Sequence, residues 1–231
     1  MKKIILNLLV LSTAIWAASF NEGDYAYNKG NYQDASKVWQ KKCNSGDSKS
    51  CNNLGVLYEN AQGVKKDYKK ASQLYKQACD QNKSDACYNL AILYQNGQGV
   101  KQNFAKTSEL FTKACDSGDA YACNNLGVLY KNGKGVKRNF TKASQLFNKA
   151  CASNIASGCY NLGVLYENAQ GLNQDYKKAK QLYQKACDSG DAHSCYNLGA
   201  LYKNGKGVIK DEKKANELYE KACKDGGCSR K

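Results

Sequence analysis

Apolar positions recur at helical spacing within a short unit of the chain. In residues 123–158, two stretches each place apolar side chains three and four positions apart. The first stretch contains Leu126, Leu129 and Tyr130, and the second contains Phe140, Ala143, Leu146, Phe147 and Ala150. Between them lies "NGKG", whose residues tolerate the left-handed backbone that ends a helix. The pattern predicts a helix–turn–helix pair.

This unit repeats along the chain. One series of cysteines recurs every 36 residues from Cys43 to Cys223, and a second series keeps the same period from Cys51 to Cys195. A fixed period of this size is typical of a solenoid, whose units bury their apolar faces only by stacking. We therefore predict an all-α, right-handed α-solenoid of helix-turn-helix repeats stapled by disulfides. Its predicted parts are an atypical capping pair in 20–50 and five repeats, at 51–86, 87–122, 123–158, 159–194 and 195–231, in one continuous array.

The N-terminal stretch "MKKIILNLLVLSTAIWAAS" has the pattern of an export signal. Lys2 and Lys3 precede an apolar core, and the small residues Ala17 and Ser19 suit a cleavage site. The core is shorter than the ~20 residues that a membrane-spanning helix needs. The sequence predicts a signal peptide at 1–19, a mature chain that begins at Phe20, and a secreted or periplasmic protein without a transmembrane segment.

Composition supports export and limits the partners. The chain has 12 cysteines, no proline and a formal net charge of +15. An even, high number of cysteines in an exported chain indicates a disulfide framework. The charge attracts anionic surfaces, or it belongs to a solvated lysine-rich face that keeps a repeat array soluble. We favour the solvated face, and export argues against nucleic acid as a partner.

The cysteines are predicted to form structural disulfides that link neighbouring helices. Cys115 falls in the last turn of one helix and Cys123 in the opening turns of the next, with Gly118 and Asp119 as the expected helix end and N-cap. Antiparallel helices joined by so short a break bring these turns within the ~5.5 Å Cα separation of a disulfide. The predicted bridges are Cys43–Cys51, Cys79–Cys87, Cys115–Cys123, Cys151–Cys159 and Cys187–Cys195, with a sixth between Cys223 and Cys228.

Two alternatives to the staples are zinc and free thiols. A structural zinc site needs four closely spaced ligands, whereas each cysteine frame offers two and His193 is the sole histidine. We expect no metal and no cofactor. For Cys223 and Cys228, which are only five residues apart, a free or intermolecular thiol stays open.

The repeat resembles a known family. The frame "NLGVLYENG.GV..DY.KA..LY.KAC" resembles the Sel-like repeat, a relative of the tetratricopeptide repeat. The added cysteine pair in each unit, after a signal peptide, resembles the Helicobacter cysteine-rich proteins. Three features depart from the frame: Ala91 replaces a glycine, Thr107 replaces an alanine, and the last cysteine spacing is shorter. The resemblance implies penicillin binding and weak β-lactam hydrolysis outside the cytoplasm; the alternative is a non-enzymatic scaffold that binds peptide or protein.

The third position of each first helix is asparagine: Asn53, Asn89, Asn125, Asn161 and Asn197. Asparagine is a poor helix former, so its recurrence needs a cause. It either binds an extended ligand, as first helices do in the related tetratricopeptide arrays, or ties down a loop between units. The preceding position carries Tyr88, Tyr160 and Tyr196, which suit a peptide, sugar or cell-wall-like ligand or are partly buried between neighbours. A further set, Asn60, Asn96, Asn132, Asn168 and Asn204, is interpreted as helix ends. We expect a monomer.

The catalytic residues of a β-lactamase are not recognisable in this sequence. Serine β-lactamases use S-x-x-K, S-D-N and K-T-G elements, and the chain contains none of them. If the cysteines are paired, no thiolate nucleophile remains. Hydrolysis would therefore need an unfamiliar site built from Tyr, Ser, Lys or Asn.

Overall fold

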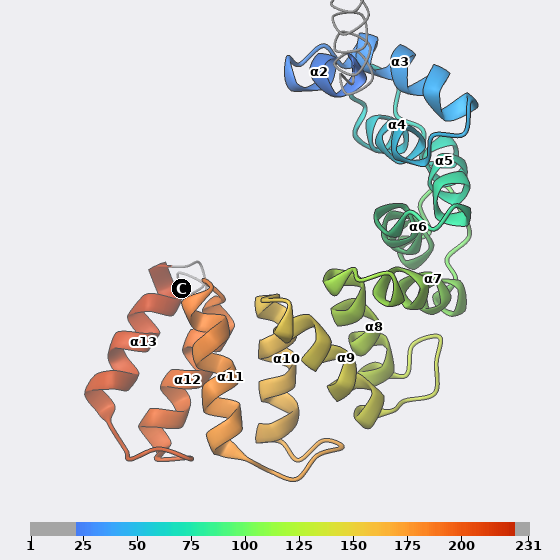
Figure 1. Cartoon of the computed structure of the whole chain (residues 1–231). Coiled ribbons are helices and arrows are strands. Elements are labelled where there is room, and N and C mark those ends of the chain that lie inside the picture. The colour runs from blue at the N-terminus through green and yellow to red at the C-terminus, as the bar shows by residue number, and fades with distance from the viewer. Residues whose placement is uncertain (1–21, 225–231) are drawn as a thin grey trace, which may run out of the picture. The chain divides into compact units, whose positions relative to one another are not determined.

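The computed structural model describes residues 22–224, and these residues are helical throughout apart from turns and loops (Figure 1). The helices are α2 (Glu22–Asn28), α3 (Tyr32–Asn44), α4 (Ser48–Asn60), α5 (Tyr68–Asp80), α6 (Ser84–Asn96), α7 (Phe104–Asp116), α8 (Ala120–Asn132), α9 (Phe140–Ala152), α10 (Ala156–Glu167), α11 (Tyr176–Asp188), α12 (Ala192–Asn204) and α13 (Glu212–Lys224). The all-α prediction is confirmed. The predicted signal peptide, at 1–19, and Cys228 lie outside the described residues.

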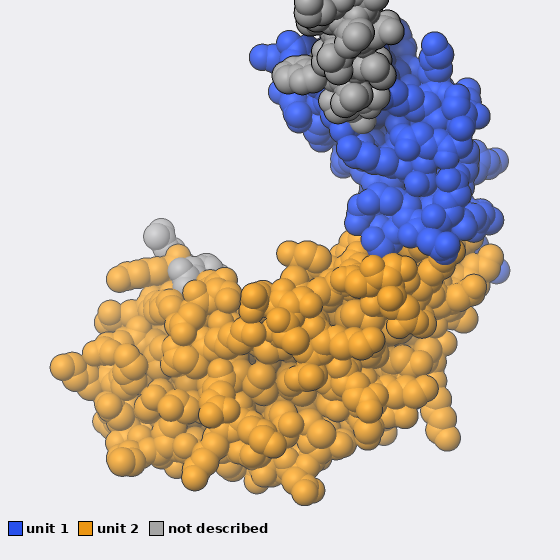
Figure 2. Space-filling view, viewed as in Figure 1, with its two compact units in different colours: residues 1–86, 98–101 blue, residues 87–97, 102–231 orange. Residues whose placement is uncertain are grey.

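The chain forms two compact units (Figure 2). The first comprises residues 1–86 and 98–101, and the second comprises residues 87–97 and 102–231. The first unit contains α2 to α5, and the second contains most of α6 together with α7 to α13. The continuous array predicted from the sequence depends on how the units are placed, and it stays a prediction.

Within each unit the helices pair as the apolar pattern predicts. Helix α4 packs on α5, α8 on α9, α10 on α11 and α12 on α13, each as the first and second helix of one repeat. Successive pairs are joined where α3 meets α4, α7 meets α8, α9 meets α10 and α11 meets α12. The shorter α2 packs on α3, and these two helices lie in the range predicted to be the capping pair.

Polar side chains fix most helix ends. Asp119 is the N-cap of α8 and accepts a hydrogen bond from the backbone N–H of Ala122, while Gly118 takes a positive φ of 93°. Asp47 and Asp191 cap α4 and α12 in the same way. Helix α10 differs, because its N-cap Ile155 makes no side-chain hydrogen bond. The second asparagine set occupies last helical or C-cap positions, so its interpretation as helix ends is confirmed.

The glycine that recurs every 36 residues in the first helices makes room for an aromatic ring. A Cβ added to Gly127 would lie 2.6 Å from the ring of Phe147 on α9, which is fully buried. Gly23 lies against Trp39 in the same way in the capping pair. In the α6–α7 repeat, the two departures from the frame meet, because the Thr107 hydroxyl lies 3.5 Å from the carbonyl oxygen of Ala91. The core therefore depends on one ring per repeat, set under one small residue.

Candidate binding face of the first helices

Disulfides join successive helix pairs at the predicted spacing. The structure contains Cys43–Cys51, Cys115–Cys123, Cys151–Cys159 and Cys187–Cys195, with Cα separations of 4.5–4.7 Å. Each bridge links the end of a second helix to the start of the next first helix. Cys79, Cys87 and Cys223 are also disulfide-bonded. The pairings Cys79–Cys87 and Cys223–Cys228 stay predictions.

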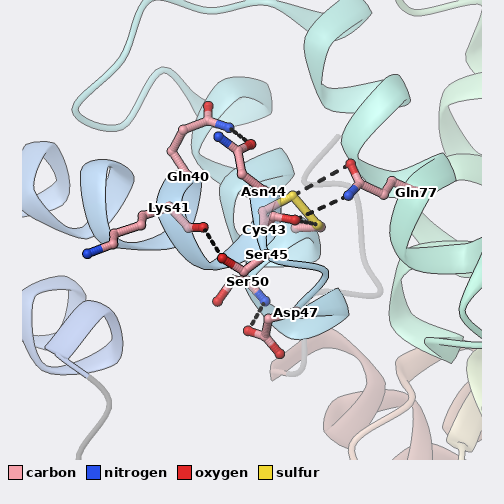
Figure 3. Close-up of a disulfide and its surroundings, with 9 residues drawn as sticks. Gln40, Lys41, Cys43, Asn44, Ser45, Asp47, Ser50 and Gln77 are labelled. Atoms are coloured by element: carbon pink, nitrogen blue, oxygen red, sulfur yellow. Dashed lines mark hydrogen bonds between the residues drawn. A yellow bond between two sulfur atoms is a disulfide. The ribbon is translucent and has the colours of Figure 1, made fainter.

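A side chain from the following second helix holds the backbone beside the bridge. Figure 3 shows the amide of Gln77, on α5, donating to the carbonyl oxygen of Cys43 over 3.2 Å. Lys185 on α11 makes the equivalent contact, with its Nζ 2.8 Å from the carbonyl oxygen of Cys151. These two contacts add a hydrogen bond beside the bridges Cys43–Cys51 and Cys151–Cys159.

The oxidised cysteines limit the chemistry of the described chain. No cysteine within residues 22–224 is a free thiol, so these residues offer no thiolate nucleophile. The same part of the chain has no group of three or more His, Cys, Asp or Glu side chains placed to hold a metal ion. His193 is exposed in the first turn of α12, where its ring centroid lies 6.1 Å from that of Tyr160.

The third-position asparagines connect neighbouring first helices. The amide of Asn161 on α10 donates to Asn124 on α8 over 3.0 Å. The amide of Asn125 lies 3.3 Å from the hydroxyl of Tyr88 on α6. In both cases the third position of one repeat reaches the second position of the preceding repeat, 37 residues earlier. We call this row of contacts the asparagine ladder. The sequence left two roles open for these asparagines, contact with a ligand and a tie to a loop; for Asn125 and Asn161 the structure shows hydrogen bonds between first helices.

The other members of the predicted site lie along the same helices. Asn53, Asn89 and Asn197 are half-buried on α4, α6 and α12. Tyr88 and Tyr160 are half-buried, with rings 5.6 Å and 6.1 Å from the second-helix rings Phe111 and Tyr183. Tyr196 is 54% exposed, 5.0 Å from Tyr219 between ring centroids. Partial burial thus applies to two of the three tyrosines.

Two buried tyrosines pair with carboxylates, which sequence reasoning missed. Tyr75 donates to Glu59 over 2.6 Å and Tyr183 donates to Glu167 over 2.7 Å. Burial raises the pKa of both phenols, and the neighbouring carboxylate raises it further. The sequence carries a signal for this pairing, because the residues at these two positions change together from repeat to repeat. Where the second helix carries Phe111 or Phe147, the place of the glutamate is taken by Gln95 or Lys131.

Lys131 is therefore a cation where two other repeats place an anion. Its side chain is half-buried, and this burial lowers the pKa of its ammonium group. The Nζ atom lies 3.4 Å from the side-chain oxygen of Asn161. Among the described lysines, Lys131 is the one whose pKa is clearly lowered. It also contacts a member of the asparagine ladder, Asn161.

A pocket opens beside Asn53, where α4 meets the capping pair. It has a volume of about 300 Å³. Its walls are Asp24, Tyr27 and Asn28 from α2, Trp39 from α3, and Asn53 and Val56 from α4. We call it the cap pocket. It combines an apolar wall with amide and carboxylate groups, which is the usual make-up of a small binding site.

Comparison with known proteins identifies the repeat. The Sel1 repeat model matches residues 48–83, 84–119, 120–155, 156–191 and 192–227, each three residues earlier than the units drawn from the cysteine period. The chain belongs to the Sel1 repeat family. The earlier start agrees with the structure, in which first helices begin at residues such as Ser48 and Ala120.

Solved Sel1 repeat proteins share this fold. A Sel1 repeat protein from Oxalobacter formigenes is 33% identical with a TM-score of 0.81, over 89% of this chain and 84% of that one. The protective antigen c5321 of uropathogenic Escherichia coli, which displays an SLR fold, is 28% identical with a TM-score of 0.81. That match covers 85% of this chain and 42% of the antigen.

One curated relative has a name that includes an activity. "Putative beta-lactamase HcpE" of Helicobacter pylori strain J99 is 39% identical over 66 residues, which make up 27% of this chain and 19% of HcpE. The same protein of strain 26695 is 38% identical over 61 residues. This Sel1 repeat protein thus matches about a fifth of the length of HcpE, and it is related to the Helicobacter cysteine-rich proteins.

The structure bears on location only coarsely. Several disulfides indicate an oxidising compartment outside the cytoplasm. Among the described helices, none combines the length and the apolar character needed to cross a membrane.

Proposed function

We propose that this Sel1 repeat protein is a non-enzymatic scaffold that binds an extended polypeptide along its first helices. The observation that supports this most is the asparagine ladder. Its amides are held by contacts such as Asn161 to Asn124 and Asn125 to Tyr88, so their directions are fixed before a ligand arrives. Fixed polar groups lose less conformational entropy on binding than mobile ones.

The ladder keeps hydrogen-bonding capacity for a ligand. An asparagine side chain has two donor hydrogens and two acceptor lone pairs, and each ladder contact uses one donor of the third-position residue. A peptide backbone alternates donors and acceptors in the same way. The half-buried Tyr88 and Tyr160 and the exposed Tyr196 add aromatic surface beside these amides. An extended peptide matches both features.

Peptide selection followed by matched alanine variants tests the scaffold. A random 12-residue peptide library is selected against the oxidised protein, and the enriched peptide is measured by calorimetry. Asn125→Ala and Tyr196→Ala are each expected to weaken it about fivefold or more, the value of one neutral hydrogen bond or a partly buried ring. Tyr121→Ala is the control, because Tyr121 is 61% exposed on α8 but outside the ladder.

Two results would count against the scaffold proposal. A library that yields no enriched sequence contradicts the proposal, as does a peptide that binds Tyr121→Ala and Asn125→Ala equally well. Helix content is followed by circular dichroism for each variant, so that loss of binding is not mistaken for loss of folding.

β-Lactam binding with slow hydrolysis is the second candidate. The short match to HcpE supports it, and so does Lys131, whose lowered pKa increases the neutral fraction of its amine, the form that can take a proton from an attacking water molecule as a general base. Without a recognised activating partner we expect turnover far below the ~1–10³ s⁻¹ typical of enzymes. Turnover is expected to resist chelators and to leave no acyl-serine adduct.

Substituting two lysines at the same repeat position distinguishes hydrolysis by this protein from hydrolysis by a contaminating β-lactamase. The protein is purified from a host without β-lactamases, and penicillin turnover is compared for Lys131→Met and Lys203→Met. Lys203 takes the same place in the last repeat but is exposed. Loss in the first variant alone supports hydrolysis at Lys131. Turnover that disappears on purification, or that is equal in both variants, contradicts it.

A further inference from the structure

The first of the third-position asparagines along the chain, Asn53, lies on α4. In the repeats after it, Asn125 and Asn161 each donate to the second position of the preceding first helix. For Asn53 that preceding helix is α2, in which Gly23 corresponds to Gly55 because each lies against the aromatic ring of the second helix that follows. Counting back from Gly23, the second position falls on residue 20, outside the described residues. Within residues 22–224, nothing accepts a hydrogen bond from the Asn53 amide nitrogen.

A second donor, the indole N–H of Trp39, lies at the cap pocket, which Asn53 also lines. Trp39 is 3% exposed, and its indole nitrogen has no hydrogen-bond partner in the described part of the chain. A buried donor without an acceptor is unfavourable by about 1–3 kcal/mol. The indole nitrogen lies beside Gly23, where a Cβ would approach it to 2.3 Å. Gly23 of α2, a helix of seven residues, therefore covers the indole nitrogen of Trp39.

The walls of the cap pocket select a neutral, partly apolar ligand. Tyr27 and Val56 supply the apolar surface, and the Tyr27 ring lies 5.5 Å from Trp39 between centroids. Asp24 lies at the wall with its carboxylate 2.6 Å from Lys49 Nζ. A carboxylate ligand would face that negative group, whereas a peptide carbonyl accepts hydrogen bonds without carrying a charge. The volume of about 300 Å³ is at the small end of ligand sites.

We propose that the cap pocket binds one bulky apolar side chain of an extended peptide, whose backbone carbonyls accept hydrogen bonds from Asn53 and Trp39. The carbonyl reaches the indole donor when α2 shifts outward by a small amount. This inference rests on the scaffold function and assigns it a defined anchoring point at the first helix after the capping pair.

The experiment uses the single tryptophan of the folded repeats. Trp16 and Trp39 are the tryptophans of the chain, so Trp16→Phe leaves one indole whether or not the leader has been removed. The probes are acetylated, amidated pentapeptides Gly-Gly-X-Gly-Gly in which X is Leu, Phe, Ala or Asp. The readout is the indole ¹H–¹⁵N resonance of the exported protein, which moves downfield when the indole N–H gains an acceptor.

The Leu and Phe peptides are expected to shift this resonance saturably, and the Ala and Asp peptides are not. Asn53→Ala should weaken the Leu peptide by roughly fivefold, the size of one neutral hydrogen bond. Tyr121→Ala is the control, because Tyr121 is exposed on α8, outside both the asparagine ladder and the cap pocket, and its loss should leave the affinity unchanged. Thermal melting of both variants shows that each remains folded.

Three results would overturn the assignment. The first is an indole resonance that no probe moves, and the second is an Asn53→Ala variant that binds like the parent protein. The third is a resonance that already lies at the hydrogen-bonded position in the free protein, which would mean that the chain's own N-terminal residues fill the pocket. If the library-selected peptide still binds in these cases, the scaffold stands and only the cap pocket fails. If neither that peptide nor the pentapeptides bind, both proposals fail.

Discussion

Tyr183 and Phe147 occupy the same position in successive repeats. The first-helix residue that faces this position is a glutamate beside the tyrosine and a lysine beside the phenylalanine. Tyr183 has Glu167 as the acceptor for its hydroxyl, whereas Phe147 has Lys131 at that place. Tyr75 and Glu59 repeat the first combination. A buried hydroxyl needs an acceptor, and a buried carboxylate needs a donor, so the two positions change together. Tyr219 with Lys203 departs from this rule in the last pair, where Tyr219 is only half-buried.

Exchanging one combination for the other tests this coupling. Tyr183→Phe removes the hydroxyl that donates to Glu167 and should lower the free energy of unfolding by about 1.5–3 kcal/mol, the range for hydrogen bonds to charged groups. The double variant Tyr183→Phe/Glu167→Lys recreates the Lys131 and Phe147 combination. It should be more stable than the sum of the single variants predicts, as measured by urea unfolding. Strict additivity would contradict the coupling.

Alkaline pH should act through the same tyrosines. In the folded protein the pKa of Tyr75 and of Tyr183 is raised above its usual value of about 10, while in the unfolded chain it is not. Their contribution to stability is therefore complete below about pH 10 and is lost as the pH rises above it. The double variant Tyr75→Phe/Tyr183→Phe should show a shallower decline of melting temperature between pH 9 and 11. An equal decline in both proteins would contradict this reasoning.

At the scale of helices, local sequence accounts for most boundaries. Asp119 before α8, Gly118 with its positive φ and the asparagines at helix ends all act through their own backbone, so the sequence alone predicts them. The asparagine ladder was not predictable in this way. It depends on which positions of two helices, 37 residues apart in sequence, come within 3.0–3.3 Å. Apolar periodicity identifies the buried face of each helix but not the register between helices.

Helix α10 offers a direct test of capping. Ile155 has φ −78° and ψ 110°, close to the −73° and 106° of Asp119, yet it provides no side-chain acceptor. Ile155→Asp should therefore raise the free energy of unfolding by about 1 kcal/mol, less the burial lost with the half-buried isoleucine. The expected rise in melting temperature is roughly 2–4 °C. Ile155→Ala is the control, and an equal or higher melting temperature for it would contradict capping as the cause.

At the scale of the whole molecule, disulfides join neighbouring helix pairs into longer cooperative segments. Each bridge closes a loop of nine residues, which stabilises the fold by roughly 2.5 kcal/mol in the chain-entropy model. In a repeat array a break at an internal boundary separates the segments on its two sides, whereas a break near an end releases only that end.

Removing single bridges should expose this difference. Cys115→Ser/Cys123→Ser is expected to lower the unfolding midpoint and the denaturant slope, because the second unit loses an internal link. Cys43→Ser/Cys51→Ser, beside the capping pair, should release a smaller helical fraction in an early, separate step. Circular dichroism in urea distinguishes the two. Identical curves for both double variants would contradict the nearest-neighbour description.

The short sequence separation of each bridge also has a consequence for how the chain acquires its covalent structure. Eight cysteines already allow 105 connectivities, and this chain has 12. Within each observed bridge the partners are eight residues apart, and loops of about ten residues close in 10–100 ns, faster than distant partners meet. In a chain that enters an oxidising compartment from its N-terminus, the two cysteines of each pair can thus meet before the next pair arrives, which favours the local partner when the bond forms. Correct pairing then follows from the order of entry.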